Sequence, residues 1–169
     1  MKQPIAGVSP AELGEVTVMT VWPSIAAYPS GQFLGWLYSW KWPDVYIFRV
    51  GNLLALLSIP HALALYVYRI LPWVGIRYTL TNRRIVVRRG LTGVDHKSID
   101  LDRFNSIDID VKWGQAWFHA GDLVFKLNGV ETFRLPGVSR PEAYRSTCLH
   151  SQRSHAGVKK ALQRQMSDA

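Results

Sequence analysis

The chain has 169 residues, of which 20 are Lys or Arg and 12 are Asp or Glu, so its formal net charge is +8. This length leaves room for one membrane segment or hairpin and one small soluble domain. The single cysteine, Cys148, excludes an intrachain disulfide framework and a cysteine-rich metal site. Seven Trp and seven Tyr are typical of a chain with much of its mass at the boundary between water and lipid.

The N-terminal part divides into a polar leader, residues 1–15, and a region predicted to be membrane-associated, residues 16–73. The leader lacks the apolar run of a signal peptide. Residues 20–40 carry no charged side chain, but prolines and glycines interrupt them. We expect this segment either to lie in the membrane interface or to span as an imperfect helix. Within it, Gly31 and Gly35 have the GxxxG spacing that permits close helix contact.

The second half of this region predicts a transmembrane helix over residues 49–71. Residues 50–68 contain no Asp, Glu, Lys or Arg, and about twenty apolar residues suffice to cross a bilayer. Six arginines follow before the next acid: Arg69, Arg77, Arg83, Arg84, Arg88 and Arg89. This bias places the C-terminal domain on the cytoplasmic side of a bacterial inner membrane.

Residues 74–150 show the period of β-strands and then of one helix. Asn128-Gly129 between two alternating runs predicts a two-residue hairpin turn. That register pairs Leu127 with Val130, Lys126 with Glu131, and Val124 with Phe133.

A capping box at Ser139 and Glu142, with Pro141 in the first turn, predicts the helix that follows. Tyr144 and Cys148 share one face of it, so Cys148 is predicted to be a core thiol. Residues 151–169 form a basic tail.

Four short motifs in this order resemble the bacterial pleckstrin-homology (PH) membrane proteins of the YdbS/YdbT-like group (DUF304). They are Tyr-Thr-Leu-Thr-Asn-Arg-Arg from residue 78, Ser-Ile-Asp-Leu-Asp-Arg-Phe from residue 98, Ala-Gly-Asp-Leu-Val-Phe from residue 120, and Leu-Pro-Gly-Val-Ser-Arg-Pro from residue 135. The resemblance covers residues 74–150. It implies a mainly-β, PH-like domain of about seven strands in two orthogonal sheets, closed by one C-terminal helix, and a binding or scaffolding module rather than an enzyme.

The sequence offers little for catalysis or for a bound cofactor. A calcium loop counted from Asp100 fails, because Phe104 and Asn105 occupy positions that need an oxygen ligand and a glycine. Neither a phosphate-binding glycine loop nor a zinc-protease helix is present. His61 lies within the predicted membrane helix, where an ionisable side chain is a weak candidate ligand for a pigment, a haem or a proton. We therefore expect no metal, no cofactor and no enzymatic activity.

Two sets of residues are the predicted contacts to lipid or to a partner. One is the arginine set of the first hairpin: Arg83, Arg84, Arg88 and Arg89. The other is the tryptophan set of the membrane region: Trp22, Trp36, Trp40, Trp42 and Trp73.

Three functions remain open at this stage, none of them involving nucleic acid. The first is an accessory or assembly subunit of a larger inner-membrane complex, photosynthetic or respiratory. The second is a stand-alone module that binds anionic lipid through the arginine set. The third is an intramembrane cofactor carrier centred on His61.

Overall fold

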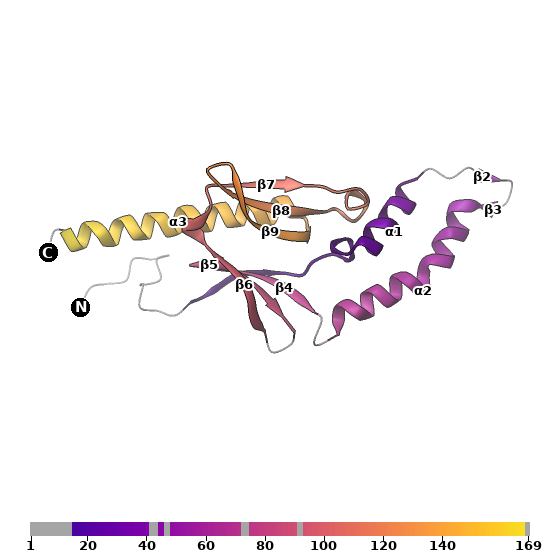
Figure 1. The fold of residues 1–169 in the computed structure, drawn as a ribbon, viewed down its shortest axis with the longest axis horizontal. Helices are drawn as coiled ribbons and strands as arrows, with labels where there is room; N and C mark the ends of the chain where they lie inside the picture. Colours follow the sequence, from indigo (N-terminus) through magenta and orange to yellow (C-terminus); the bar gives the residue numbers. More distant parts are fainter. Residues whose placement is uncertain (1–14, 41–43, 46–47, 72–74, 91–92, 168–169) are drawn as a thin grey trace.

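The computed structural model describes residues 15–40, 44–45, 48–71, 75–90 and 93–167 of the chain. A domain of two β-sheets lies at the centre, a helical hairpin projects from one end, and the C-terminal helix runs along the domain and beyond its other end (Figure 1). The prediction of a mainly-β domain in two sheets with one C-terminal helix is confirmed.

Both sheets are antiparallel, and together they contain seven strands within the described residues. The first has the order β1-β4-β5-β6, formed by Thr17–Val21, Ile76–Thr81, Arg84–Arg89 and Val94–Asp100. The second has the order β7-β8-β9, formed by Ser106–Asp110, Ala120–Leu127 and Val130–Ser139. Their inner faces and helix α3 (Pro141–Ser167) enclose one core, to which Tyr78, Ile85, Phe125 and Tyr144 contribute fully buried side chains.

Strand β1 lies within residues 16–73, the region predicted to be membrane-associated, and it belongs to the first sheet. Residues 17–21 form the edge strand beside β4, with Thr20 opposite Thr79 and Val21 opposite Tyr78. Met19 and Val21 pack against the core. The β-branched Thr and Val residues of this strand suit a half-buried position. The run carries no charge, so by composition it looks like a continuation of the apolar segment. The helical hairpin is therefore an insertion between two neighbouring strands of one sheet.

The hairpin contains a short helix and a long one. A 3₁₀ turn, η1 (Ile25–Ala27), leads into α1 (Pro29–Ser39), and α2 (Val50–Ile70) returns to the domain. Two short paired strands, β2 (Asp44–Val45) and β3 (Phe48–Arg49), lie at the tip. Eleven residues of α1 extend about 16 Å, whereas a bilayer core is about 30 Å thick. The length of α1 therefore favours the interfacial interpretation of residues 20–40 over a full span.

The β8–β9 hairpin confirms two of the three predicted pairs and corrects the third. Leu127 lies opposite Val130 and Lys126 opposite Glu131, and both Asn128 and Gly129 have the positive φ that a type I′ turn requires. The register then shifts, so that Phe133 lies opposite Phe125 rather than Val124. The reason is a bulge at Thr132, whose hydroxyl donates to the Phe125 carbonyl oxygen at 3.2 Å. The bulge brings the Phe125 and Phe133 rings into edge-to-face contact.

Helix α3 begins at the predicted proline but without the predicted capping box. Ser139 is the last residue of β9 and lies opposite Ala120, so its hydroxyl does not cap the helix. The turn is made instead by Arg140, with a φ of 49°. Cys148 is fully buried beside Tyr144, as predicted.

Most of the predicted basic tail continues α3. Gln152 Nε2 donates to the carbonyl oxygens of Leu101 and Phe104, and Lys159 Nζ lies 2.6 Å from Asp102 Oδ2. These contacts hold residues 151–159 against η2 (Leu101–Arg103).

We expect Cys148 of the folded chain to resist thiol reagents. Burial raises the pKa of this thiol to about 12, so the reactive thiolate is scarce at neutral pH. Modification by a chromogenic disulfide reagent in mild detergent should therefore occur only as the protein unfolds. A Val130→Cys variant at the exposed turn should react at once on its added thiol. Fast modification of the folded wild-type chain would contradict the placement of Cys148 in the core.

Candidate membrane-contact site

Helix α2 presents an apolar surface that the rest of the chain leaves uncovered. It is the one helix among the described residues that is long and apolar enough to cross a membrane, over Val50–Tyr68. None of that window is buried within the structure, and Leu57 is 77% exposed. In a soluble protein such a helix would be largely buried. Its length, composition and exposure make α2 a candidate membrane-contact element.

Helix α1 packs on the domain through glycines. A Cβ on Gly35 would lie 2.0 Å from the Gly114 carbonyl oxygen, and one on Gly31 would lie 2.0 Å from the Ile25 carbonyl oxygen. The two glycines of the GxxxG spacing therefore pack against Ile25 and Gly114, and not against a second helix as expected. They let α1 approach η1 and the loop between β7 and β8.

A buried carboxylate fixes that loop. Asp122 is fully buried, and it accepts hydrogen bonds from Gln115 Nε2 at 2.8 Å and from the Gly137 N–H at 2.9 Å. Lys112 Nζ lies 2.7 Å from its other oxygen, and Arg134 Nη1 lies 3.3 Å from the same atom. Gln115 is also fully buried and reaches the Ala26 carbonyl oxygen at 3.3 Å. Asp122 therefore connects the loop to β9, and Gln115 connects the loop to η1.

The environment of Asp122 favours its ionised form. Burial alone would raise its pKa, but hydrogen bonds from Lys112, Gln115 and the Gly137 N–H outweigh burial and lower it. The carboxylate therefore stays charged at neutral pH, and its partners are held as donors around it.

The same loop carries aromatic side chains onto α1. The Trp113 and Trp36 ring centroids lie 6.4 Å apart, and those of Trp117 and Tyr38 lie 4.9 Å apart. We call the rings that these contacts join the aromatic cluster: Phe33, Trp36, Tyr38, Trp40, Trp113, Trp117 and Phe118. Five of its seven members are exposed large hydrophobic residues. Such amphipathic rings suit the water–lipid boundary.

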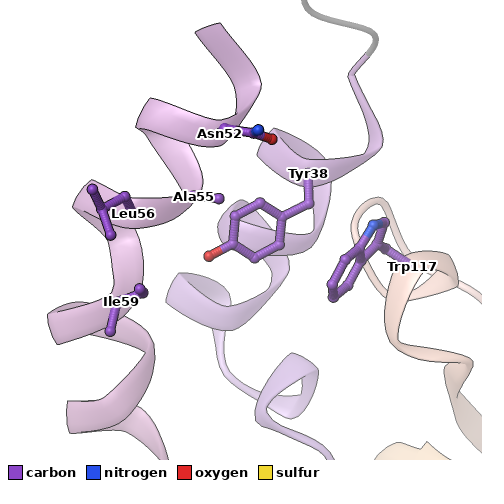
Figure 2. A pocket seen from close by; sticks show the side chains of 6 residues that line it. All are labelled: Tyr38, Asn52, Ala55, Leu56, Ile59 and Trp117. Atoms are coloured by element: carbon purple, nitrogen blue, oxygen red, sulfur yellow. The ribbon is translucent and has the colours of Figure 1, made fainter. Parts of the chain in front are cut away.

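A groove of about 490 Å³ separates α1 from α2 near this cluster. Figure 2 shows Tyr38 pointing from α1 toward α2, with Trp117 on its other side. The Tyr38 and Ser58 hydroxyls are hydrogen-bonded to each other, which ties the two helices together. The groove is lined by Tyr38, Asn52, Ala55, Leu56, Ile59 and Trp117.

The predicted tryptophan set is only partly gathered here. Trp36 and Trp40 belong to the aromatic cluster. Trp22 is exposed and lines a separate hollow of about 560 Å³ with Tyr66 and Arg140. Trp42 and Trp73 lie outside the described residues.

The predicted arginine set is divided between the two ends of β5. Arg89 lies opposite Ile76, beside the end of α2, whereas Arg83 and Arg84 lie at the distal β4–β5 turn. Arg84 and Arg89 are five positions apart along the strand, which is about 16 Å.

Two members of the arginine set are also engaged with acids. Both Arg84 Nε and Nη2 lie 2.8 Å from the Glu15 carboxylate, and Arg88 Nε lies 3.1 Å from Asp95. The hydrogen bond from Arg84 holds the pKa of Glu15 below its usual value. The four arginines therefore do not form one free basic patch.

His61 is exposed on α2, next to Pro60. Among the residues that the structure describes, no three His, Cys, Asp or Glu side chains are grouped so that they could hold a metal ion.

Comparison with protein families identifies the domain. The family model of the bacterial PH domain matches residues 16–152, most of the chain, and the chain belongs to this family. The match begins at the start of β1 and ends within α3. Searches of curated proteins and of solved structures found no match.

Sequence reasoning missed the loop that completes this site. Trp113 and Trp117 follow a predicted strand, and Asp122 follows a glycine at the start of the next strand. The sequence signal for this loop was the pair Trp113 and Trp117 around Gly114, a few residues before Asp122, the one acidic residue of β8. That signal does not say which segments the loop contacts, because the partners lie about eighty residues away in sequence.

We expect Gly35→Ala to destabilise the protein by about 1–3 kcal/mol, because the new methyl group meets the Gly114 backbone. Thermal unfolding in mild detergent, followed by tryptophan fluorescence, measures this. Gly157→Ala is the matched control, since Gly157 is also helical and has open space around it. The control should stabilise α3 by about 1 kcal/mol. An unchanged melting temperature for Gly35→Ala would contradict the packing of α1 on the loop.

Asp122→Asn should destabilise the protein by about 1–3 kcal/mol at neutral pH. The pKa of Asp122 is lowered by folding, so its ionised form contributes stability above the unfolded value of about 3.9. This contribution is lost as the pH falls through the lower folded pKa. The stability difference between wild type and variant should therefore shrink below about pH 4.

Urea unfolding of both chains between pH 3 and pH 7 measures that difference. Glu142→Gln, which removes an exposed carboxylate, reports the effect of one surface charge alone. A difference that stays constant with pH would show that the charge of Asp122 is not what stabilises the junction.

Proposed function

We propose that the chain is a membrane-anchored, non-enzymatic PH-like scaffold of the bacterial inner membrane. The observation that carries this proposal is the apolar, uncovered α2, attached by both ends of its hairpin to adjacent strands of a PH-like domain. The resemblance to the YdbS/YdbT-like membrane proteins supports the same placement. Arginines after α2 favour a cytoplasmic position for the domain.

Within this function, we favour an accessory or assembly subunit of a larger membrane complex, with photosynthetic and respiratory complexes as the partner classes. A lone helix exposes its whole circumference to lipid, and α2 also carries Asn52 and His61 on exposed positions. Polar side chains in a membrane helix are commonly used to contact neighbouring helices. The groove beside Asn52 is open to such a neighbour.

The stand-alone lipid module draws less support from the structure. Arg84 and Arg88 are paired with acids, and the arginine set is split between two ends of the domain. Arg89 is the member placed beside the end of α2. For the cofactor carrier, His61 belongs to no group of three or more His, Cys, Asp or Glu side chains among the described residues.

The expected result for the chain in its own membrane is migration within a large complex. The measurement is extraction in mild detergent, a native gel, and mass spectrometry of the band that holds a C-terminally tagged chain. The tag would sit at the end of α3 farthest from the hairpin (Figure 1).

A double variant tests whether α2 makes the contact. Leu56→Ala with Leu63→Ala trims two exposed side chains on one face of α2 and should weaken comigration, while the chain stays in the membrane pellet after an alkaline wash. Val130→Ala trims an equally exposed side chain at the distal turn and is the control. Migration of the wild-type chain as a small free species would contradict the subunit role.

A further inference from the structure

We propose that the β7–β8 loop, residues 111–118, inserts into the membrane beside α1 and α2 and forms a third membrane contact. This inference rests on the proposed membrane anchoring. The loop belongs to the β-domain by sequence, but it lies against the hairpin (Figure 1). Its Gly114 backbone is in close contact with Gln32 and Gly35 of α1.

The contacts of the loop set its depth along the hairpin. The Trp117 ring packs against the Tyr38 ring, and the Tyr38 hydroxyl is hydrogen-bonded to the Ser58 hydroxyl of α2. Ser58 lies twelve residues before the end of α2, which is about 18 Å along the helix. A side chain at that level cannot stay outside the bilayer if α2 crosses it, unless α2 is strongly tilted. Trp117 therefore shares the depth of α1.

The exposed side chains of the loop are apolar. Val111, Trp113 and Trp117 are 51%, 56% and 47% exposed. Trp113 contacts Trp36, which contacts Trp40, so these exposed rings link the loop to the exposed apolar side chains of α1. Tryptophan is the residue most suited to the water–lipid boundary, because its ring is apolar and its N–H can reach water or headgroups.

Charged side chains stop where the loop begins. Asp110, Glu131 and Arg134 form an exposed ion-pair group on the outer face of the second sheet, with Arg134 2.8 Å from each acid. The next position, Val111, is apolar. Lys112 is the one charged residue between 111 and 118, and its ammonium turns back to Asp122. A bilayer surface that passes between Asp110 and Val111 leaves the ion pairs in water and the tryptophans in lipid.

The backbone of the loop suits a site with little water. The N–H groups of Gln115, Phe118 and His119 donate to carbonyl oxygens within the loop. The Lys112 N–H donates to the Gln115 side chain. Because an unpaired backbone group costs several kcal/mol in lipid, these internal bonds make insertion feasible. The buried Gln115 and Asp122 hold the loop in this shape from below.

Fluorescence quenching on the full chain in nanodiscs tests the insertion. A Cys148→Ala background receives one cysteine at a time, labelled with an environment-sensitive dye. Trp113→Cys reports the loop, Leu57→Cys reports α2, and Val130→Cys reports the distal turn. Val111→Cys is a second loop position in case the Trp113 variant folds poorly. Nitroxide-labelled lipid and aqueous iodide serve as the two quenchers.

The expected result is a loss of fluorescence with nitroxide lipid for Trp113→Cys and Leu57→Cys, and with iodide for Val130→Cys. Leu57 quenched by lipid with Trp113 and Val111 quenched by iodide would overturn the insertion and leave the anchoring intact. Leu57 quenched by iodide would overturn the proposed anchoring itself. Loop positions shielded from both quenchers would show that protein covers the loop, which also overturns the inference.

Discussion

The Asp122 carboxylate is buried among groups from the β7–β8 loop and from β9, and it holds these two segments together. Lys112 and Gln115 approach it from the β7–β8 loop, and Gly137 from β9. Gln115 then reaches Ala26 at the start of the hairpin. A buried charge is tolerated only when its hydrogen bonds are satisfied together, so these segments order as a unit. The direction in which the hairpin leaves the domain follows from that unit.

Close backbone contact completes the junction. Gly35 and Gly114 approach so closely that neither position has room for a side chain. The two stems of the hairpin continue into β1 and β4, which pair directly at Val21 and Tyr78. The two ends of the hairpin therefore adjoin neighbouring strands of one sheet.

Features set by local chemistry were predictable from the sequence, and features set by distant partners were not. Asn128-Gly129 gives its turn because both residues tolerate positive φ. Tyr144 and Cys148 lie one helical turn apart and face the core together. The bulge at Thr132, in contrast, depends on how Phe133 packs against Phe125. The role of Asp122 was hidden because its donors come from positions up to fifteen residues away and Gln115 connects it to η1. Strand β1 was hidden because an uncharged Thr-Val run reads equally well as strand or apolar segment.

The arrangement also limits where a soluble partner subunit can bind in the proposed complex. The hairpin and the β7–β8 loop occupy one end of the domain, and α3 extends from the opposite end (Figure 1). Gln152 and Lys159 hold residues 151–159 of α3 against η2, and the helix continues beyond them as an arm to Ser167. Arg153 and Lys160 are exposed on it. In the proposed membrane-anchored arrangement, this arm points away from the hairpin, and its charges lie away from the bilayer (Figure 1). In the complex proposed above, these charges are available to an acidic surface of a partner subunit.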